Sequence, residues 1–122
     1  MANTTYDASS LLSKRLRPKA GAYLKSLRQS AEMTQLDVAK ALNVKYYTFV
    51  SQLETGHGRV PPHHYVPLAK AFGIDRAIFT KEMLRYYDPF TYAGLFGGHP
   101  DATNTELEAA AEHLMNKKGS SK

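Results

Sequence analysis

The chain has 122 residues, of which 43% are hydrophobic and 11% aromatic, enough for one small domain with an extension and no disulfide support. Cysteine is absent, which excludes a disulfide framework and thiolate metal sites and fits a reducing cytoplasm. The net charge is +5, and residues 1–100 hold 13 basic and 7 acidic residues, so this part is expected to attract polyanions such as nucleic acid.

The N-terminus, MANTTYDASS, has no basic segment followed by an apolar run. Nowhere do about 18 apolar residues follow one another, so we expect a cytoplasmic protein with neither a secretion signal nor a membrane span. Residues 1–13 are rich in Ser, Thr and Ala without a period, which predicts a mobile tail or a short helix near Ser9 to Leu16.

A cluster of positive charge follows this tail, formed by Lys14, Arg15, Arg17 and Lys19. We therefore expect residues 1–18 to be a flexible basic arm. Such an arm could place Arg15 and Arg17 on the phosphates or in the minor groove of DNA, or it could remain solvated.

The next segment predicts a helix from about Lys19 to Ser30, with Pro18 suited to its first turn. Its expected core stripe consists of Tyr23, Leu24, Leu27 and Ala31.

The stretch Thr34 to Gly56 combines apolar period, turn residues and polar placement in the pattern of two helices joined by a turn. Thr34 is a suitable N-cap for the first helix, and Asn43 tolerates the left-handed backbone that ends one. The expected core residues of this first helix are Leu36, Ala39 and Leu42.

In the second helix, Val50 and Leu53 lie three apart and are expected to face the first helix. Tyr46 is expected to be its N-cap or first residue. Phe49 borders both faces, and could pack inward or touch a thymine methyl group. The residues left on the outward side are Tyr47, Thr48, Ser51 and Gln52.

The segment GHGRVPP, residues 56–62, predicts a loop, and a helix from about His63 to Phe72 should follow and end at Gly73. His57, His63 and His64 lack the spacing and carboxylate partners of a metal site, so we expect no metal and no cofactor. Asp75 is expected to cap a further helix, with an apolar stripe of Ile78, Phe79, Met83 and Leu84.

Residues 86–122 are expected to form a C-terminal extension. Tyr86, Tyr87, Phe90, Tyr92, Leu95 and Phe96 crowd its first part. So much apolar surface should pack on its own bundle or on another subunit, and we favour a dimer contact. Residues 101–105 should be a polar linker, and residues 105–117 a final helix.

The central run resembles the Cro/λ-repressor-like helix-turn-helix family, also called the XRE family, over roughly Gly21 to Met83. The residues that carry the resemblance are Leu24, Leu27, Arg28, Thr34-Gln35, Ala39, Val44 and Leu53-Glu54-Thr55-Gly56. It implies an all-α fold, a five-helix λ-repressor-like bundle over residues 19–85, and an ion pair between Arg28 and Glu54. Val44 to Gly56 is one residue longer than is usual in the family, which places the extra residue in the turn.

The resemblance implies that the second helix of the motif reads base pairs in the major groove of double-stranded DNA. The candidate base-reading residues are Tyr46, Tyr47, Thr48, Ser51 and Gln52, of which Gln52 is preferred because its amide matches the edge of adenine. The candidate phosphate contacts are Gln35, Lys45, Arg59, Arg15 and Arg17.

The sequence thus favours a DNA-binding transcriptional regulator, a homodimeric repressor that reads an inverted repeat. The alternative is a DNA-binding antitoxin or interaction module whose C-terminal extension binds a partner protein. An enzyme has little support, because no nucleophile set, carboxylate pair, phosphate loop or metal spacing is visible.

Overall fold

The computed structural model describes residues 8–109, which form an all-α fold, as the sequence predicts. The elements are α1 (Ala8–Ser30), α2 (Gln35–Ala41), α3 (Thr48–Thr55), the 3₁₀ helix η2 (Pro62–His64), α4 (Tyr65–Phe72), α5 (Arg76–Tyr87) and α6 (Pro89–Phe96). These are seven elements instead of the five predicted: α1 to α5 lie in or overlap residues 19–85, and the 3₁₀ helix η2 and α6 are additional. A further helical run begins at residue 104 and continues to the last described residue, 109.

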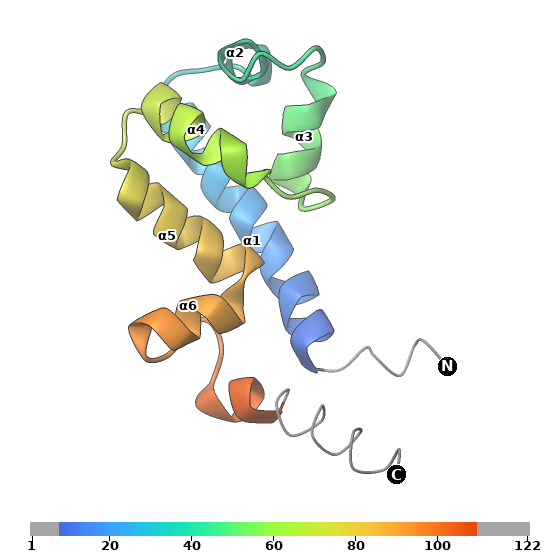
Figure 1. Cartoon of the computed structure of the whole chain (residues 1–122). Helices are drawn as coiled ribbons and strands as arrows, with labels where there is room; N and C mark the ends of the chain where they lie inside the picture. Colours follow the sequence, from blue (N-terminus) through green and yellow to red (C-terminus); the bar gives the residue numbers. More distant parts are fainter. Residues whose placement is uncertain (1–7, 110–122) are drawn as a thin grey trace.

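Helix α1 is the long central element of the fold and runs diagonally through it, with α3 on one side and α5 on the other (Figure 1). Its buried stripe begins well before the predicted start of the helix, because Leu12 and Leu16 are only 4% and 0% exposed. Pro18 therefore lies inside the helix instead of at its first turn, and the flexible arm predicted for residues 1–18 is wrong for residues 8–18.

The energies explain why the helix continues through Pro18. An internal proline costs about 3 kcal/mol through the lost hydrogen bond and the ring clash. Burial of each leucine contributes about 1.5 to 3 kcal/mol, so Leu12 and Leu16 together offset that cost. Ala20 and Leu24 continue the same stripe into the second half of the helix, where both are buried.

The ends of α2 follow the predicted capping residues. The backbone N–H of Asp37 donates to Thr34 Oγ1 at 3.0 Å, and that of Thr34 donates to an Asp37 carboxylate oxygen at 2.8 Å, which completes a capping box. Asn43 has a φ of 56° and ends the helix in the left-handed region. The predicted core position of Leu36 is wrong: Leu36 is exposed, and Val38 is buried together with Ala39 and Leu42.

Two further predicted caps frame α4 and α5. Gly73 ends α4 with a φ of 71°, and Asp75 Oδ1 accepts hydrogen bonds from the backbone N–H groups of Ala77 and Ile78. Phe79 is fully buried, and its ring lies near those of Tyr23, Tyr65 and Phe72, with centroids 6.2 to 6.3 Å apart. Ile78, predicted in the same stripe, is exposed.

The aromatic segment packs partly on its own bundle. Tyr86, Tyr87 and Tyr92 are buried, so the intramolecular alternative holds for these three residues. Leu95 and Phe96, at the end of α6, remain 63% and 48% exposed. The dimer contact predicted for this segment stays a prediction, and the side chains exposed for it are Leu95 and Phe96.

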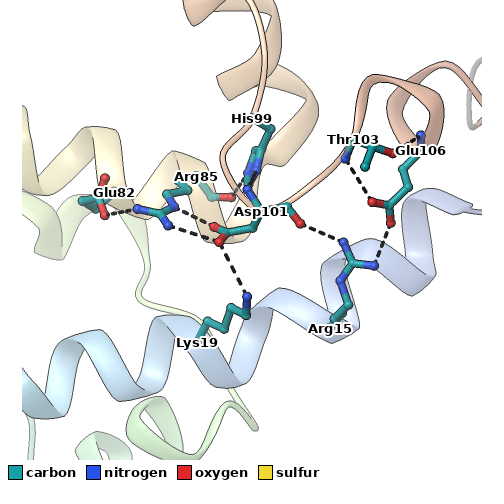
Figure 2. Close-up of polar contacts among 8 residues, drawn as sticks. All are labelled: Arg15, Lys19, Glu82, Arg85, His99, Asp101, Thr103 and Glu106. Atoms are coloured by element: carbon teal, nitrogen blue, oxygen red, sulfur yellow. Dashed lines mark hydrogen bonds and ion pairs between the residues drawn. The ribbon is translucent and has the colours of Figure 1, made fainter.

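Residues 97–109, which we call the C-terminal strap, are fastened to α5 (Figure 2). Arg85 donates from Nε and Nη2 to the two carboxylate oxygens of Asp101, at 2.7 and 3.2 Å. His99 Nε2 lies 2.6 Å from the Arg85 carbonyl oxygen, and His99 Nδ1 accepts from the backbone N–H of Asp101 at 3.0 Å. Residues 101–103 connect α6 to the final helical run, as predicted for a polar linker, and Asp101 fastens this connection to α5.

The strap is also fastened to α1. Arg15 donates to Glu106 Oε2 at 2.7 Å and to the Asp101 carbonyl oxygen at 2.9 Å, and Lys19 Nζ lies 3.5 Å from Asp101 Oδ1 (Figure 2). The Arg15 bond and the backbone N–H of Thr103 hold the pKa of Glu106 down at about 2. The final helix starts at residue 104, and residues 110–117 of its predicted span lie outside the described residues.

Gly21 permits the close approach of α1 and α3. A Cβ at this position would lie 2.2 Å from the Glu54 carbonyl oxygen and 2.9 Å from that of Leu53. Both atoms belong to the backbone of α3, so no side chain can move aside to make room. Helix α3 can therefore rest on α1 only while residue 21 has no side chain.

We expect Gly21→Ala to lower the free energy of unfolding by about 2 to 4 kcal/mol, because α3 must move away from α1. Urea denaturation followed by circular dichroism measures this. Gly94→Ala is the matched control. No atom lies within 4 Å of its added Cβ, and alanine in the interior of α6 should raise stability by about 0.5 to 1 kcal/mol. Equal effects of the two substitutions would contradict the tight contact.

We expect Asp101→Asn to lower the free energy of unfolding by about 1 to 3 kcal/mol at neutral pH, since Arg85 and Lys19 lose a charged partner. The Arg85 hydrogen bond, followed by the nearby Lys19 and His99, lowers the pKa of Asp101. The carboxylate therefore stabilises the fold above its unfolded pKa, and this contribution is lost as the pH falls through the folded pKa. Denaturation of both proteins between pH 7 and pH 2 should show their difference shrinking toward acid; a constant difference would contradict the charged role.

Candidate nucleic-acid interface

Helix α3 is held by one apolar side and exposes the other. Val50 and Leu53 are buried against the core, as predicted, and Gly56 ends the helix with a φ of 86°. The helix begins at Thr48 with Tyr47 as N-cap. Tyr46, predicted as the N-cap or first residue, therefore lies one position before the cap.

The outward side of α3 and the turn before it form what we call the polar edge, which consists of Tyr46, Tyr47, Thr48, Ser51 and Gln52. Tyr46 and Tyr47 are 63% and 53% exposed, Thr48 and Gln52 are exposed, and Ser51 is half-buried. Within residues 8–109 no hydrogen bond occupies the side chains of this edge. Its hydroxyl and amide groups therefore face solvent and are available to a partner.

Phe49 is the residue for which the sequence left two orientations open. Its side chain is half-buried and packs against the core, and its ring centroid lies 5.9 Å from that of His64 in an edge-on arrangement. The inward orientation thus anchors the first turn of α3. Phe49 therefore does not belong to the polar edge.

Arg28 of α1 and Glu54 of α3 form the ion pair implied by the family resemblance. Arg28 Nε donates to Glu54 Oε2 at 2.6 Å and Nη2 donates to Oε1 at 3.1 Å, so the contact is bidentate. The two side chains are only 13% and 5% exposed. Arg28 Nη1 also donates to the Met33 carbonyl oxygen at 2.9 Å, which ties the loop before α2 to the same guanidinium. The hydrogen bond to Glu54 raises the pKa of Arg28.

Gln35, predicted to bind phosphate, joins this pair. Its Nε2 donates to Glu54 Oε1 at 3.1 Å from the first turn of α2, and its side chain is half-buried. The amide therefore links α2 to α3. Only the second N–H of the Gln35 amide is then left to donate to a phosphate oxygen.

Arg59 was predicted as a phosphate contact after α3, but the structure directs its guanidinium inward. Nη2 donates to Asp88 Oδ2 at 3.1 Å and to the Tyr65 hydroxyl at 3.0 Å, and the guanidinium carbon lies 4.7 Å from the ring centroid of Tyr87. The side chain fastens the loop after α3 to the junction of α5 and α6. This placement does not support the prediction, because the charge is already compensated by Asp88.

The remaining predicted phosphate contacts lie in different places. Lys45 is exposed in the turn before α3, and its Nζ lies 5.5 Å from the ring centroid of Tyr46, so it lies beside the polar edge. Arg15 is engaged with Glu106 on the strap. Arg17 lies on α1 beside the end of α3, where it lines a cleft.

This cleft was not predicted from the sequence. Its volume is about 470 Å³, and it is lined by Ser13, Lys14, Arg17, Pro18, Thr55, Gly56 and His57. Thr55 Oγ1 and His57 Nδ1 lie 2.8 Å apart across its α3 side. The cleft exists because α1 extends past Pro18 toward its N-terminus, over residues predicted to be a flexible arm.

The histidines after α3 do not gather around a common point. The rings of His63 and His64 have centroids 4.1 Å apart and are tilted by 41°, and burial together with the nearby His63 lowers the pKa of His64. Among residues 8–109, no three His, Asp or Glu side chains converge as metal ligands would. In the same range, no helix has the length and apolarity required to span a bilayer.

Comparison of the chain with protein-family models, curated proteins and solved structures finds no significant match.

We expect Glu54→Gln to lower the free energy of unfolding by about 3 kcal/mol, because it leaves the Arg28 charge buried without its counterion. Thermal and urea denaturation measure the loss. Glu108→Gln, on an exposed side chain of the strap, removes the same charge and should change stability by less than about 0.5 kcal/mol. Comparable losses in the two variants would show that the pair does not hold α3.

Proposed function

We propose that the protein is a sequence-specific double-stranded DNA-binding protein that regulates transcription. The observation that carries this proposal is the polar edge of α3, whose side chains form no hydrogen bond within residues 8–109 while Val50 and Leu53 hold the opposite side of the helix in the core. Two α-helices joined by a short turn, with the second one exposed in this way, are the arrangement of a helix-turn-helix. The resemblance of the sequence to the Cro/λ-repressor-like family agrees with this interpretation.

In the proposed complex, α3 lies in the major groove. Gln52 is the preferred base-reading residue, because its amide N–H can donate to N7 of adenine while its amide oxygen accepts from N6, which makes a bidentate pair. Tyr46, Tyr47, Thr48 and Ser51 can add single hydrogen bonds and apolar contacts to bases or sugars. The Arg28–Glu54 pair contributes by fixing the angle at which this edge meets the groove.

Phosphate contacts supply most of the sequence-independent affinity of such proteins. Lys45 stands beside the polar edge, and the excess of basic over acidic residues in residues 1–100 adds a positive field around it. Binding should accordingly weaken as salt rises, since each neutralised phosphate releases counterions. Arg15 and Arg59, held by Glu106 and Asp88, are assigned no part in this proposal.

The exposed end of α6 favours a second subunit. Leu95 and Phe96 present apolar surface, and Lys81 of α5 lies with its Nζ 4.3 Å from the ring centroid of Phe96. A two-fold contact through this surface would pair two copies of α3 and suit an inverted repeat. A second candidate function is a DNA-binding antitoxin or interaction module, in which the same surface binds a different protein.

Selection of bound duplexes from a random pool should return an inverted repeat whose half-sites are centred about 10 base pairs apart. We expect Gln52→Ala to relax the preference at one position in each half-site, with a loss of about 1 to 3 kcal/mol of discrimination and little change in non-specific affinity. Gln29→Ala is the matched control, because Gln29 is exposed near the end of α1 and lies outside the polar edge.

The selected pool distinguishes the candidates. A pool that stays random would overturn sequence-specific binding. An unchanged preference in the Gln52→Ala selection would overturn its role as base reader. A single half-site would indicate that one copy binds DNA alone. The exposed surface of Leu95 and Phe96 would then be open to a partner protein, as the second candidate function requires.

A further inference from the structure

The cleft between α1 and the end of α3 has rigid walls on two sides. Ser13, Lys14, Arg17 and Pro18 form the α1 wall, and Thr55, Gly56 and His57 form the other. A Cβ on Gly56 would lie 3.0 Å from the Pro18 backbone nitrogen, so the two walls meet closely at the base of the cleft. Figure 1 shows α3 beside α1. A volume of about 470 Å³ falls within the usual range of small-molecule sites.

The lining of the cleft carries basic groups and no carboxylate. Arg17, Lys14 and His57 contribute the nitrogen donors, and Ser13 and Thr55 contribute hydroxyl groups. Guanidinium and ammonium groups together with hydroxyls are the set that proteins use to hold phosphate oxygens. The composition of the lining therefore favours an anion with several acceptor atoms.

Arg17 differs from four other arginines of the chain in how its charge is compensated. Arg15, Arg28, Arg59 and Arg85 each form an ion pair with a carboxylate. Within residues 8–109, Arg17 has no carboxylate partner, and its guanidinium carbon lies 5.9 Å from the ring centroid of Tyr87. The aromatic contact orients the guanidinium and leaves its N–H donors to a ligand.

The opposite wall presents a histidine that is already oriented. Thr55 Oγ1 donates to the Gln52 carbonyl oxygen at 3.2 Å, so toward His57 Nδ1, 2.8 Å away, it acts as an acceptor. This assignment places a ring proton on Nδ1. His57 Nε2 then donates to a phosphate oxygen in the form of the ring that carries a proton on both nitrogens.

We propose that this cleft is a phosphate-binding site, with Arg17 as its main ligand and His57 as a second contact. The phosphate could belong to the backbone of the DNA that α3 is proposed to read, or to a free phosphorylated compound. Only the first source rests on the proposed function. The competing explanation is that these cations merely offset the negative end of the α3 dipole, and it predicts no specific binding.

Titration of the full-length protein with inorganic phosphate, at ionic strength kept constant with chloride, tests the site directly. We expect the ¹H–¹⁵N signals of the Arg17 side chain and of His57 to shift and saturate together. Arg17→Gln should weaken phosphate binding about tenfold, the effect of losing one charge-assisted hydrogen bond. Arg76→Gln removes the same charge from an exposed position at the start of α5 and should leave binding within twofold.

A second measurement, the salt dependence of binding to a random-sequence duplex, identifies the source. If the cleft holds a backbone phosphate, Arg17→Gln should reduce the slope of log affinity against log salt by about 1, and Arg76→Gln should not. Phosphate binding with an unchanged slope would support the site with a free phosphorylated compound as its ligand. If the protein binds phosphate but no duplex, the phosphate site is supported and the proposed DNA-binding function is overturned.

Signals that do not saturate in the wild-type protein, or equal effects of Arg17→Gln and Arg76→Gln on phosphate binding, would overturn the proposal. The wild-type titration decides even if Arg17→Gln does not fold.

Discussion

The contact between α1 and α3 is the constraint on which the exposed surface of this protein depends. Gly21 lets the backbone of Leu53 and Glu54 rest directly on α1. Two turns further along α1, the Arg28–Glu54 ion pair joins the same two helices. The first effect is steric and the second electrostatic, so together they fix both the separation and the rotation of α3. An eight-residue helix is too short to be stable by itself, and its orientation has to be imposed in this way.

Helix α1 also connects parts of the fold that the sequence suggested were separate. Its N-terminal half carries Arg15 and Lys19, which hold the C-terminal strap, and its later turns carry Gly21 and Arg28, which hold α3. The strap and α3 are thus attached to one rigid rod. A change that disturbs the early turns of α1 would therefore reach both the C-terminal extension and the candidate interface.

Local features of the fold could be predicted from sequence, because they depend on residues within a few positions of each other. Thr34, Asn43, Gly73 and Asp75 act as caps through their own backbone conformations or short hydrogen bonds. The start of α1 could not be predicted in the same way. Helix continuation through Pro18 depends on the burial of the residues before it, and that requires partners distant in sequence.

The arginines show most clearly which part of the candidate site could not be predicted from the sequence, namely whether each charge has a carboxylate partner. Arg15, Arg17 and Arg59 give the same sequence signal, a basic residue near a proposed binding element, yet two of them meet a carboxylate more than 25 residues away and one does not. The partners Glu106 and Asp88 belong to the segments least explained by the family resemblance. Because a compensated guanidinium contributes little to an external field, the proposed phosphate contacts would have to come from fewer side chains than the sequence suggested. Within residues 8–109, cations without a carboxylate partner stand at both ends of α3, with Lys45 before its start and Arg17 in the cleft at its end. These two sites bracket the polar edge, so any phosphate held at either one would lie beside the bases that α3 is proposed to read.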